Sequence, residues 1–559
     1  MTRGLDRQQI GVSDAMLKTY GEIVFQLSNN VQHRKGDPIR EGLLKEVMRQ
    51  RPALGMSDAQ IAAYVGISEN QVTYIRNQEE ITRMRANNFQ RLLNLGGGHR
   101  FRVDQFVPHE EQFRFREDAM ELRSAMHFDP ECARSYIERG WWTNETLRGW
   151  LEQHTRELPK QNAILDSDCV VTYADLAIAV DHLAGALLRL GVHKGDIVAV
   201  QLPNCPEYLI SYLAIAQIGA VMTTAYMPHR ADEYMTLLGH SRARAVICLS
   251  DADGFAPAKT LVELKPKLPA LHHVIALGSP IAGAESYQAL VGTGESIKNF
   301  ADSAPVAADP LVLLYGSSSM ASPKGVLHSY HTVLSNARLN ASEYKIDADD
   351  ILLSACPYGH FFGLSSLTLA ACVGAANVTL PTFTPASLAK IIESSRPTVL
   401  FATPTHIAAC LDTGLFDQHD ISSLKLAFLS GNNIPHDLVR DFDAKLVNGE
   451  VIQLWGMTEM QAGLHSQAGH TDTMEDMAAA TAARPSTGTE VRIVDDNGSP
   501  TPNGKEGELQ ARGCHVFSGY LRNENANALA FTPDGWFRSG DLAMGDAAGN
   551  VYINHQDSH

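Results

Sequence analysis

The stretch Leu311-Val-Leu-Leu-Tyr-Gly-Ser-Ser-Ser-Met-Ala-Ser-Pro-Lys-Gly-Val326 decides how the rest of the chain is interpreted. Its first five residues are apolar, which predicts a short buried strand. The small residues that follow let a backbone wrap closely round a guest group, and their N–H and hydroxyl donors suit an anion. Lys324 adds a positive charge. The stretch therefore predicts a phosphate-binding loop, although serine, proline and glycine also fill ordinary surface turns.

Length, charge and cysteine usage narrow the class of protein. At 559 residues the chain is too long for one hydrophobic core, so we expect roughly two to four domains. A net charge of −17 argues against a chain that coats nucleic acid along its whole length. The eight cysteines form no C-x-x-C pair, which disfavours a zinc ribbon or a redox dithiol and fits a reducing cytoplasm. The polar amino terminus lacks a signal core, and residues 364–380 predict a buried helix and strand rather than a membrane span.

Residues 1–125 differ from the rest of the chain, because they are rich in arginine, glutamine and asparagine and predict an all-helical module. Residues 57–76 have the pattern of a helix-turn-helix, with Ser57 and Ser68 as caps and Gly66 at the turn. One interpretation is DNA contact through the second helix. The other is a packing or dimerisation module, which we favour in so acidic a chain.

From residue 126 to residue 555 the chain alternates amphipathic helices with short apolar strands. We expect helices over residues 175–190 and 208–218 and strands over 197–202 and 245–249. This alternation predicts an α/β domain with mostly parallel sheets.

Two further stretches combine residue types suited to binding a nucleotide. Gln453-Leu-Trp-Gly-Met-Thr-Glu459 offers an aromatic ring, a hydroxyl and a carboxylate, and Mg²⁺ usually takes one or two protein carboxylates plus phosphate oxygens. Asp534-Gly-Trp-Phe-Arg-Ser-Gly-Asp-Leu542 contains a carboxylate, Asp541, directly after a glycine. Pro357-Tyr-Gly-His-Phe-Phe-Gly363 places a histidine and two aromatic rings between glycines, which suits a pocket wall or a core turn.

Taken in order, these stretches resemble the adenylate-forming superfamily, which includes acyl-CoA synthetases, luciferases and peptide-synthetase adenylation domains. The loop resembles Y-T-S-G-T-T-G-x-P-K-G, with Ser318, Met320 and Ala321 as departures. The later stretches resemble Q-x-Y-G-x-T-E, with Trp455 for tyrosine, and G-W-x-x-T-G-D, with Ser539 for threonine. The resemblance is closest to acyl- or aryl-CoA ligases and covers about residues 140–555. It implies the large amino-terminal domain of the adenylate-forming fold, in which parallel sheets with helices are joined by a small β-rich subdomain.

The resemblance implies roles for individual residues, with ATP, Mg²⁺ and CoA as cofactors. The implied catalytic residues are Lys324, Thr458 and Glu459, and the implied metal ligands are Glu459 and Ser319. The implied nucleotide-binding residues are Ser317, Ser318, Ser319, Lys324, Gly431, Asn432, Asn433, Trp455, Gly456, Thr458 and Asp541. The implied acid-pocket residues are His360, Phe361, Gly363, Asn433 and Met457.

The match stops at the carboxyl end. After Asn554 the family has G-R-x-K-D, whereas this chain has His555-Gln-Asp-Ser-His559. We interpret residues 126–555 as the adenylation domain and residues 556–559 as the start of the hinge. The family's carboxyl-terminal domain, roughly a hundred residues that carry a lysine for adenylation, is expected to be absent.

The predicted function is ATP-dependent activation of a carboxylic acid to acyl-AMP, followed by thioester formation with CoA. Two alternatives are an adenylation domain that loads a carrier protein and a non-catalytic acyl-AMP or acid sensor that binds DNA. The expected partners are a small carboxylic acid and the thiol of CoA or of a carrier protein. A homodimer is left open, and DNA is not favoured.

Overall fold

The computed structural model describes residues 128–292, 304–316, 323–431, 434–467 and 482–554, together with Leu122 and Met126. All of them belong to one unit of the chain, residues 115–559. The predicted helix-turn-helix at residues 57–76 lies outside the described residues, as does nearly all of the predicted helical module.

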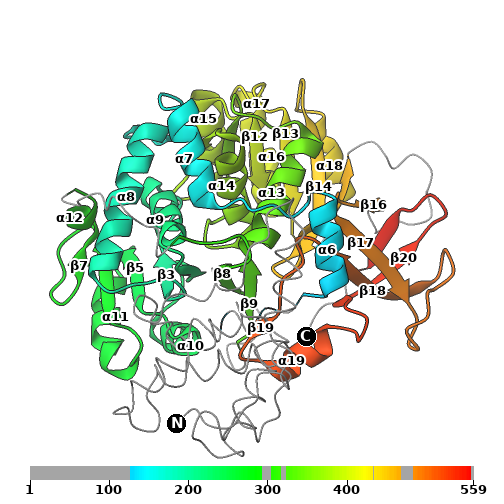
Figure 1. Cartoon of the computed structure of the whole chain (residues 1–559). Helices are drawn as coiled ribbons and strands as arrows, with labels where there is room; N and C mark the ends of the chain where they lie inside the picture. Colours follow the sequence, from blue (N-terminus) through cyan, green and yellow to red (C-terminus); the bar gives the residue numbers. More distant parts are fainter. Residues whose placement is uncertain are drawn as a thin grey trace, which may run out of the picture. The chain divides into compact units, whose positions relative to one another are not determined.

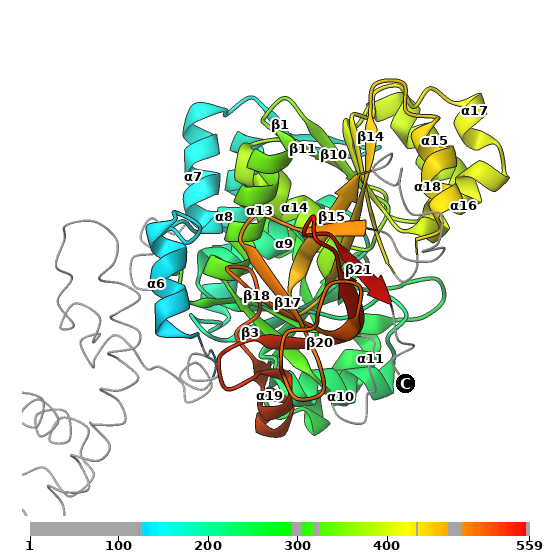
Figure 2. The same ribbon diagram turned by 90° about the vertical axis from the view of Figure 1, so that its right-hand side faces the viewer.

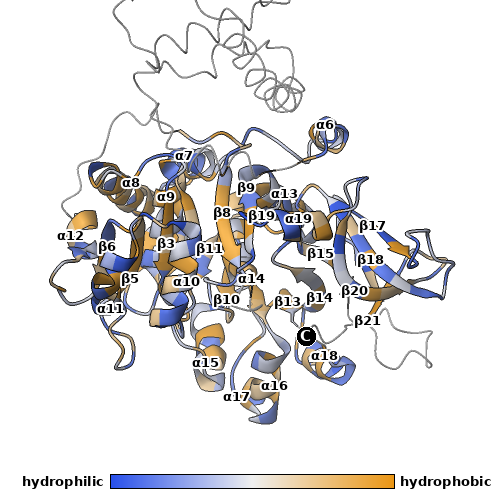
Figure 3. Cartoon of the chain, turned by 90° about the horizontal axis from the view of Figure 1, so that it is seen from below, coloured by the Kyte–Doolittle hydropathy of each residue, from blue (hydrophilic) through white to orange (hydrophobic). Residues whose placement is uncertain are grey.

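The first sheet has eight strands in the order β19-β9-β8-β4-β3-β5-β6-β7. The strands are β3 (Ile197–Gln201), β4 (Val221–Thr224), β5 (Ala245–Leu249), β6 (His273–Leu277), β7 (Glu285–Ser286), β8 (Pro310–Tyr315), β9 (Gly325–Ser329) and β19 (Tyr520–Leu521). From β8 to β7 all neighbours run parallel, whereas β9 pairs antiparallel with β8 and β19 pairs antiparallel with β9. Strands β3 and β8 are buried along their whole length, as parallel strands covered on both faces should be (Figure 3).

The second sheet has thirteen strands in the order β17-β18-β20-β21-β16-β15-β14-β13-β12-β10-β11-β1-β2. The strands are β1 (Asn162–Leu165), β2 (Val170–Thr172), β10 (Ile351–Ser354), β11 (Ala376–Val378), β12 (Val399–Ala402), β13 (Leu426–Ser430), β14 (Glu450–Met457), β15 (Gln461–Gln467), β16 (Ala482–Pro485), β17 (Thr489–Val494), β18 (Glu506–Gly513), β20 (Phe537–Gly545) and β21 (Val551–Asn554). The stretch from β1 to β14 is parallel, and every pair from β14 to β17 is antiparallel.

Helices cover both faces of the two sheets (Figure 1). The helices are α6 (Pro130–Glu138), α7 (Leu147–Glu157), α8 (Tyr173–Arg189), α9 (Pro206–Gln217), α10 (Ala231–Ser241), α11 (Pro257–Leu264), the 3₁₀ turn η3 (Lys265–Lys267), α12 (Tyr287–Gly292), α13 (Tyr330–Tyr344), α14 (Phe361–Val373), α15 (Pro385–Ser395), α16 (Pro404–Asp412), α17 (Leu415–Gln418), α18 (His436–Asp443) and α19 (Glu524–Ala530). Helices α8, α9, α13 and α14 share one core cluster with strands of both sheets, so they form the layer between the sheets. Helices α10 and α11 cover the outer face of the first sheet, and α15–α18 gather on the outer face of the second (Figure 2).

The α/β class is confirmed, with sheets that are mixed rather than mostly parallel, and most predicted elements lie within two residues of their expected bounds. Helix α8 begins at Tyr173 because the Thr172 side chain accepts a hydrogen bond from the backbone N–H of Asp175, which forms a capping box. Helix α9 begins at Pro206, a residue that suits the first helical position. The antiparallel carboxyl-terminal strands correspond to the small β-rich subdomain that the resemblance implies, although short turns between irregular polar stretches carry too little periodic signal to place the individual strands.

The segment at residues 364–380 is the buried helix and strand that its composition predicted. Most of it forms α14 and β11, and Gly374 ends the helix at φ +81°. Within the described part of the chain, no helix is both long and apolar enough to cross a membrane.

Candidate active site

The turn between β14 and β15 carries the threonine and glutamate of the predicted nucleotide site. The two strands pair antiparallel, with Met457 opposite Gln461, so Thr458, Glu459 and Met460 form a tight connection at the end of β14. Gly456 is required there, because a Cβ at this position would lie 1.7 Å from the carbonyl oxygen of Gln461. The glycine of this motif therefore has a packing reason that is independent of any ligand.

Lys324 meets Glu459 across 135 residues of sequence through the ring of Tyr520. The Tyr520 hydroxyl donates to Glu459 Oε1 at 2.8 Å, and the Lys324 ammonium lies 5.6 Å from the centre of the same ring. The backbone N–H of Phe517 also donates to the Glu459 carbonyl oxygen at 2.6 Å. The lysine of the predicted phosphate-binding loop and the carboxylate of the second motif thus lie in one cluster with Tyr520, to which the sequence had assigned no role.

The surroundings of Glu459 shift its protonation. Burial raises the pKa of the Glu459 carboxyl, and the Tyr520 hydroxyl and the Lys324 charge oppose that shift. The same burial raises the pKa of Tyr520, and the neighbouring Glu459 charge raises it further, so the phenol stays a hydrogen-bond donor.

Glu459 also fits the ligand set of Mg²⁺, which binds through one or two carboxylates and completes its shell with phosphate oxygens and water. No preformed group of three or more His, Cys, Asp or Glu side chains exists among the described residues.

His328 holds the Thr458 end of the turn in place. Its Nε2 donates to the carbonyl oxygen of Thr458 at 2.7 Å, and its Nδ1 accepts from the Thr332 hydroxyl at 3.1 Å. The ring is fully buried, and this burial lowers its pKa to about 4, which keeps the imidazole neutral with its proton on Nε2. His328 therefore connects β9 and the start of α13 to the turn that carries Thr458 and Glu459.

Trp455 and Asp541 bring the second and third motifs together. The indole N–H of Trp455 donates to Asp541 Oδ2 at 3.1 Å, although 86 residues separate them in sequence. Trp455 is 9% exposed, so only part of the ring remains open to a ligand. A tyrosine or phenylalanine at this position has no ring N–H, so this contact is a consequence of the tryptophan in this chain.

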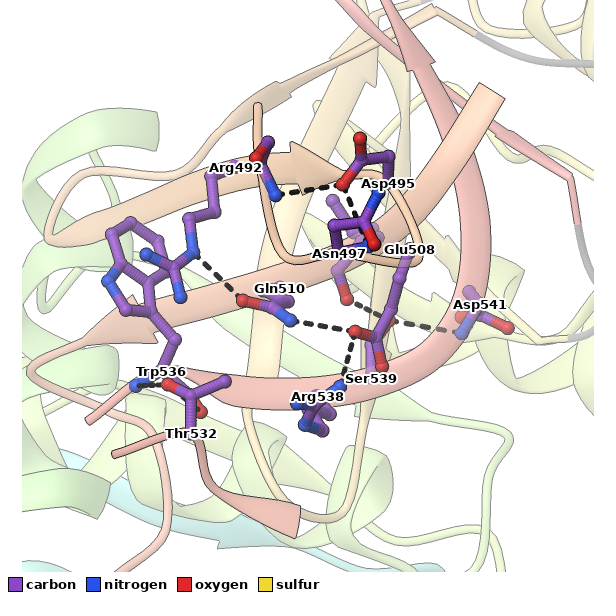
Figure 4. Close-up of polar contacts among 12 residues, drawn as sticks. Arg492, Asp495, Asn497, Glu508, Gln510, Thr532, Trp536, Arg538, Ser539 and Asp541 are labelled. Atoms are coloured by element: carbon purple, nitrogen blue, oxygen red, sulfur yellow. Dashed lines mark hydrogen bonds and ion pairs between the residues drawn. The ribbon is translucent and has the colours of Figure 1, made fainter. Parts of the chain in front are cut away.

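The strand that carries Asp541 is fixed by its neighbours in the carboxyl-terminal sheet (Figure 4). The Ser539 hydroxyl accepts from the Asp541 backbone N–H at 3.1 Å and donates to the Leu509 carbonyl oxygen at 2.7 Å. A polar row then crosses the sheet from Arg492 to Gln510, from Gln510 to Glu508 and from Arg538 to Glu508. The serine that replaces the family's threonine therefore still orients the strand.

Several predicted nucleotide-binding residues lie outside the described residues, namely Ser317, Ser318, Ser319, Asn432 and Asn433, so their roles stay predictions. Gly431 is described at the carboxyl end of β13, with φ +149°, where a Cβ would lie 3.3 Å from Pro404. Because β13 and β14 are parallel neighbours, Gly431 lies at the same edge of the sheet as the Thr458–Glu459 turn.

The predicted acid-pocket residues occupy structural positions at the start of α14. His360 caps this helix by accepting from the Phe362 N–H at 3.2 Å, and its ring stacks on Tyr226 at 6.5 Å. Phe361 is buried with its ring 4.9 Å from that of His328, and a Cβ on Gly363 would lie 2.1 Å from the Pro357 carbonyl oxygen. Met457 is half-buried at the end of β14.

A cavity that the sequence did not predict lies between α13, α14 and the ends of β12–β15. Its enclosed volume is ≈ 20 Å³, and the hollow with its open mouth measures ≈ 360 Å³. It is lined by Val333, Asn336, Ala337, Asn340, Ser365, Thr368, Leu369, Phe401, Phe428, Leu454 and Gln461. The available signal was the position of Asn336 and Asn340, one helical turn apart and just after the histidine that follows the loop.

Known proteins resemble this chain in sequence and in fold. The profile of the AMP-binding enzyme family matches residues 151–521. The medium-chain fatty-acid–CoA ligase of Escherichia coli is 26% identical over 444 residues, which cover 78% of this chain and 77% of that protein. The salicyl-AMP ligase / salicyl-S-ArCP synthetase of Mycobacterium tuberculosis is 30% identical over 438 residues, which cover 76% of this chain and 75% of that protein. The apo structure of Mycobacterium smegmatis MbtA superposes with a TM-score of 0.69 at 28% identity, covering 78% of this chain and 81% of that one.

The fold and the converging motifs define a nucleotide-dependent ligase. The chain belongs to the AMP-binding enzyme family, so the resemblance seen in the sequence is confirmed. The predicted enzyme class, an AMP-forming acid–thiol ligase, is confirmed at the same level.

Proposed function

We propose that the chain activates a carboxylic acid with ATP to acyl-AMP and then transfers the acyl group to the thiol of CoA. The observation that carries the proposal is the meeting of three motifs in one place. Lys324, Tyr520 and Glu459 form one contact cluster. Trp455, which lies in the strand that leads into Glu459, donates a hydrogen bond to Asp541. Structural reasons alone do not require a lysine, a carboxylate and a tryptophan–carboxylate pair to converge at the end of one parallel strand.

In the proposed first step, an oxygen of the acid's carboxylate attacks the α-phosphorus of ATP, and the bond from that phosphorus to the bridging oxygen breaks, releasing pyrophosphate. The work of the protein is positioning and charge stabilisation. Lys324 is assigned to the phosphates, the Thr458 hydroxyl to the α-phosphate, the exposed part of the Trp455 ring to the adenine and Asp541 to the ribose hydroxyls.

Glu459 is the residue assigned to Mg²⁺, whose charge would offset the negative charge of the phosphates when bound. The Tyr520 hydroxyl holds one oxygen of this carboxylate at 2.8 Å, which fixes the direction of the other. Ser319 is the second predicted ligand and lies outside the described residues.

In the proposed second step, the thiol sulfur attacks the acyl carbon, AMP leaves and the thiol proton is released. A carrier-protein thiol is a second candidate acceptor, because one relative at 30% identity is named as a salicyl-S-ArCP synthetase. Competition between CoA and a purified carrier protein for acyl-AMP formed on the chain distinguishes the two acceptors.

The first step is tested by acid-dependent exchange of labelled pyrophosphate into ATP, measured across aromatic and aliphatic acids. The proposal predicts exchange that requires both Mg²⁺ and an acid. The proposal would be contradicted if no acid supported exchange and the same preparation bound neither ATP nor an acyl-AMP analogue.

A further inference from the structure

The cavity between α13 and α14 starts at the catalytic turn. His328 bonds to both Thr458 and Thr332, and Thr332 lies in the first turn of α13. The cavity residues of that helix are Val333, Asn336, Ala337 and Asn340, which form one stripe at helical spacing. Seven residues of helix span about 10 Å, so the hollow extends roughly that far from the turn. An acid whose carboxylate faces the α-phosphate would place its other end here.

Gln461 lines this cavity, and two hydrogen bonds fix the orientation of its side-chain amide. Its Nε2 donates to the carbonyl oxygens of Thr332 and His515, both at 2.9 Å. Because both partners only accept, they fix the amide orientation and leave Oε1 as an acceptor. No described residue donates to Oε1, although Gln461 is only 7% exposed.

The backbone at Gln461 is strained, and this strain supports a functional role. Its φ is +58°, which lies in the left-handed region that residues with a side chain adopt at a cost of order 1–3 kcal/mol. Gly456 leaves the space that its carbonyl oxygen needs. A strained backbone conformation is therefore retained at the position that places the Gln461 amide next to the turn carrying Thr458 and Glu459.

Asn336 provides a donor in the same cavity. Its Oδ1 accepts from the Asn340 amide at 3.1 Å, and among the described residues no acceptor lies within bonding distance of its Nδ2. Asn336 is 4% exposed, so an unpaired donor here is unfavourable unless a guest group satisfies it. The cavity thus offers one donor and one acceptor to a single polar group.

The far end of the cavity is closed by aromatic rings. Phe401 and Phe428 lie 5.1 Å apart and are 3% and 2% exposed. Behind Phe428, Tyr344 contacts its ring at 4.9 Å, and the Tyr344 hydroxyl donates to His465 Nδ1 at 2.5 Å. The enclosed volume of the cavity is ≈ 20 Å³, which is too small for a long alkyl chain.

We propose that the acid is a small aromatic carboxylic acid bearing a hydroxyl or amino group, which Asn336 and Gln461 recognise by hydrogen bonding. The inference rests on the proposed function and assigns its substrate class. The ring lies against Phe401 and Phe428, where aromatic pairs gain energy beyond area burial. The substituent occupies the ≈ 20 Å³ interior, which has room for about one water-sized group.

The test is a calorimetric comparison of acyl-AMP analogues on the full 559-residue chain, without metal or turnover. The probes are the adenosine 5′-sulfamate derivatives of benzoate, of the three hydroxybenzoates, of the three aminobenzoates and of decanoate. All share one nucleotide, so differences in affinity report only the acid end. At least one hydroxy- or amino-substituted probe is expected to bind about tenfold more tightly than the benzoyl probe, because two hydrogen bonds contribute roughly 1–3 kcal/mol.

Three variants separate recognition from packing. Asn336→Leu and Gln461→Met each remove one hydrogen-bonding group and are expected to abolish the preference while leaving benzoyl binding within about threefold. Ser365→Ala is the matched control, because this cavity residue already donates to the Phe361 carbonyl oxygen at 2.9 Å and should leave the ranking unchanged. The thermal unfolding midpoint of each variant is measured to check that it folds. If Gln461→Met does not fold, the conclusion is drawn from Asn336→Leu alone.

The outcomes distinguish the inference from the proposed function. Equal binding of all benzoyl probes, or tightest binding of the decanoyl probe, overturns the substrate class while leaving acid activation intact. Binding of none of the eight probes overturns the proposed function itself. If both Asn336→Leu and Gln461→Met keep the preference for a substituted benzoyl probe, these two residues do not recognise the substituent.

Discussion

The two ends of the site are built in different ways. At the nucleotide end, Lys324, Trp455, Glu459 and Asp541 come from short contiguous motifs and meet through direct contacts. At the acid end, the cavity is assembled from single residues of two helices and four strands. The nucleotide is the same whichever acid is used, so the residues that contact its phosphates, ribose and adenine are constrained together. The acid differs between enzymes, so single side chains of its pocket can be exchanged independently. Under the proposed function, the first end carries out the reaction and the second selects the substrate.

The largest expected effect is at the nucleotide end. Glu459→Gln should lower acid-dependent pyrophosphate exchange on the order of 10²–10³-fold with every acid, a loss comparable to that of one preorganised charge-stabilising group. Tyr520→Phe is the control, because it removes only the hydrogen bond to Oε1 and should reduce exchange about tenfold or less. If Glu459→Gln lost pyrophosphate exchange with some acids but not with others, Glu459 would also affect the choice of acid, and the two ends would not act independently.

The next effect concerns the contact between Trp455 and Asp541. Trp455→Phe keeps an aromatic face but removes the indole N–H, so affinity for an acyl-AMP analogue should fall about tenfold, as expected for one hydrogen bond to a charged group. Because the acid end is untouched, all probes should weaken by the same factor. Calorimetry with the benzoyl and decanoyl probes checks this, and unequal losses would show that the nucleotide end also selects the acid.

A smaller effect is expected at the floor of the cavity. Phe401→Leu removes part of the aromatic wall, and each additional buried CH₂ of a probe gains about 0.8 kcal/mol. The decanoyl probe should therefore gain up to about tenfold in affinity, while pyrophosphate exchange with acetate, which does not reach the floor, stays unchanged. Thermal unfolding is measured in parallel, because a reduced core side chain destabilises by about 1 kcal/mol. Unchanged decanoyl binding in a folded variant would show that the floor does not limit chain length.

The smallest expected effect is a change in the pH dependence of folding stability, which arises from three buried histidines. Burial lowers the pKa values of His328, His331 and His515 to about 4, below the ordinary value of about 6.5. Stability that is present above pH 6.5 is then lost as the pH falls towards 4, because the unfolded state binds more protons. At pH 6 each histidine contributes a loss of roughly 1 kcal/mol.

His331→Phe provides the matched comparison for this pH dependence. The substitution keeps a ring against Trp142, which stacks on His331 at 4.6 Å, and removes one titrating group. Chemical unfolding at pH 7.5 and pH 6 should show a smaller loss of stability in the variant by somewhat under 1 kcal/mol. An identical loss in both proteins would contradict the assignment of a low pKa to His331.

The sequence motifs indicated which residues would come together at the proposed nucleotide end, but they did not indicate the residues of the proposed acid end, for a physical reason. Thr458, Glu459 and Asp541 lie in motifs whose residue types report phosphate, metal and ribose chemistry, so their meeting could be expected before the structure. Tyr520 could not, because it is one of many aromatic residues and acts only through its contact with Glu459. Asn336 and Gln461 lie 125 residues apart, and only the packing of α13 against the β14–β15 turn brings their amides into one cavity.

The predicted acid-pocket residues illustrate the same limit. His360 and Phe361 were selected as a histidine and an aromatic residue in a glycine-bounded turn, which also describes a helix cap and a core contact. The structure accounts for both by those roles, and their contact with an acid stays a prediction. Function at this end depends on which atoms remain without partners, and that information exists only in three dimensions.

The most direct test of the central claim is mass-spectrometric detection of acyl-AMP after incubation of the chain with ATP, Mg²⁺ and a mixture of benzoate, the hydroxybenzoates, the aminobenzoates and decanoate. The account predicts an acyl-AMP ion from a hydroxy- or amino-substituted benzoate as the main product, and its loss in Glu459→Gln. Absence of acyl-AMP from every acid in the unmodified chain would contradict acid activation, and decanoyl-AMP as the main product would contradict the assigned acid.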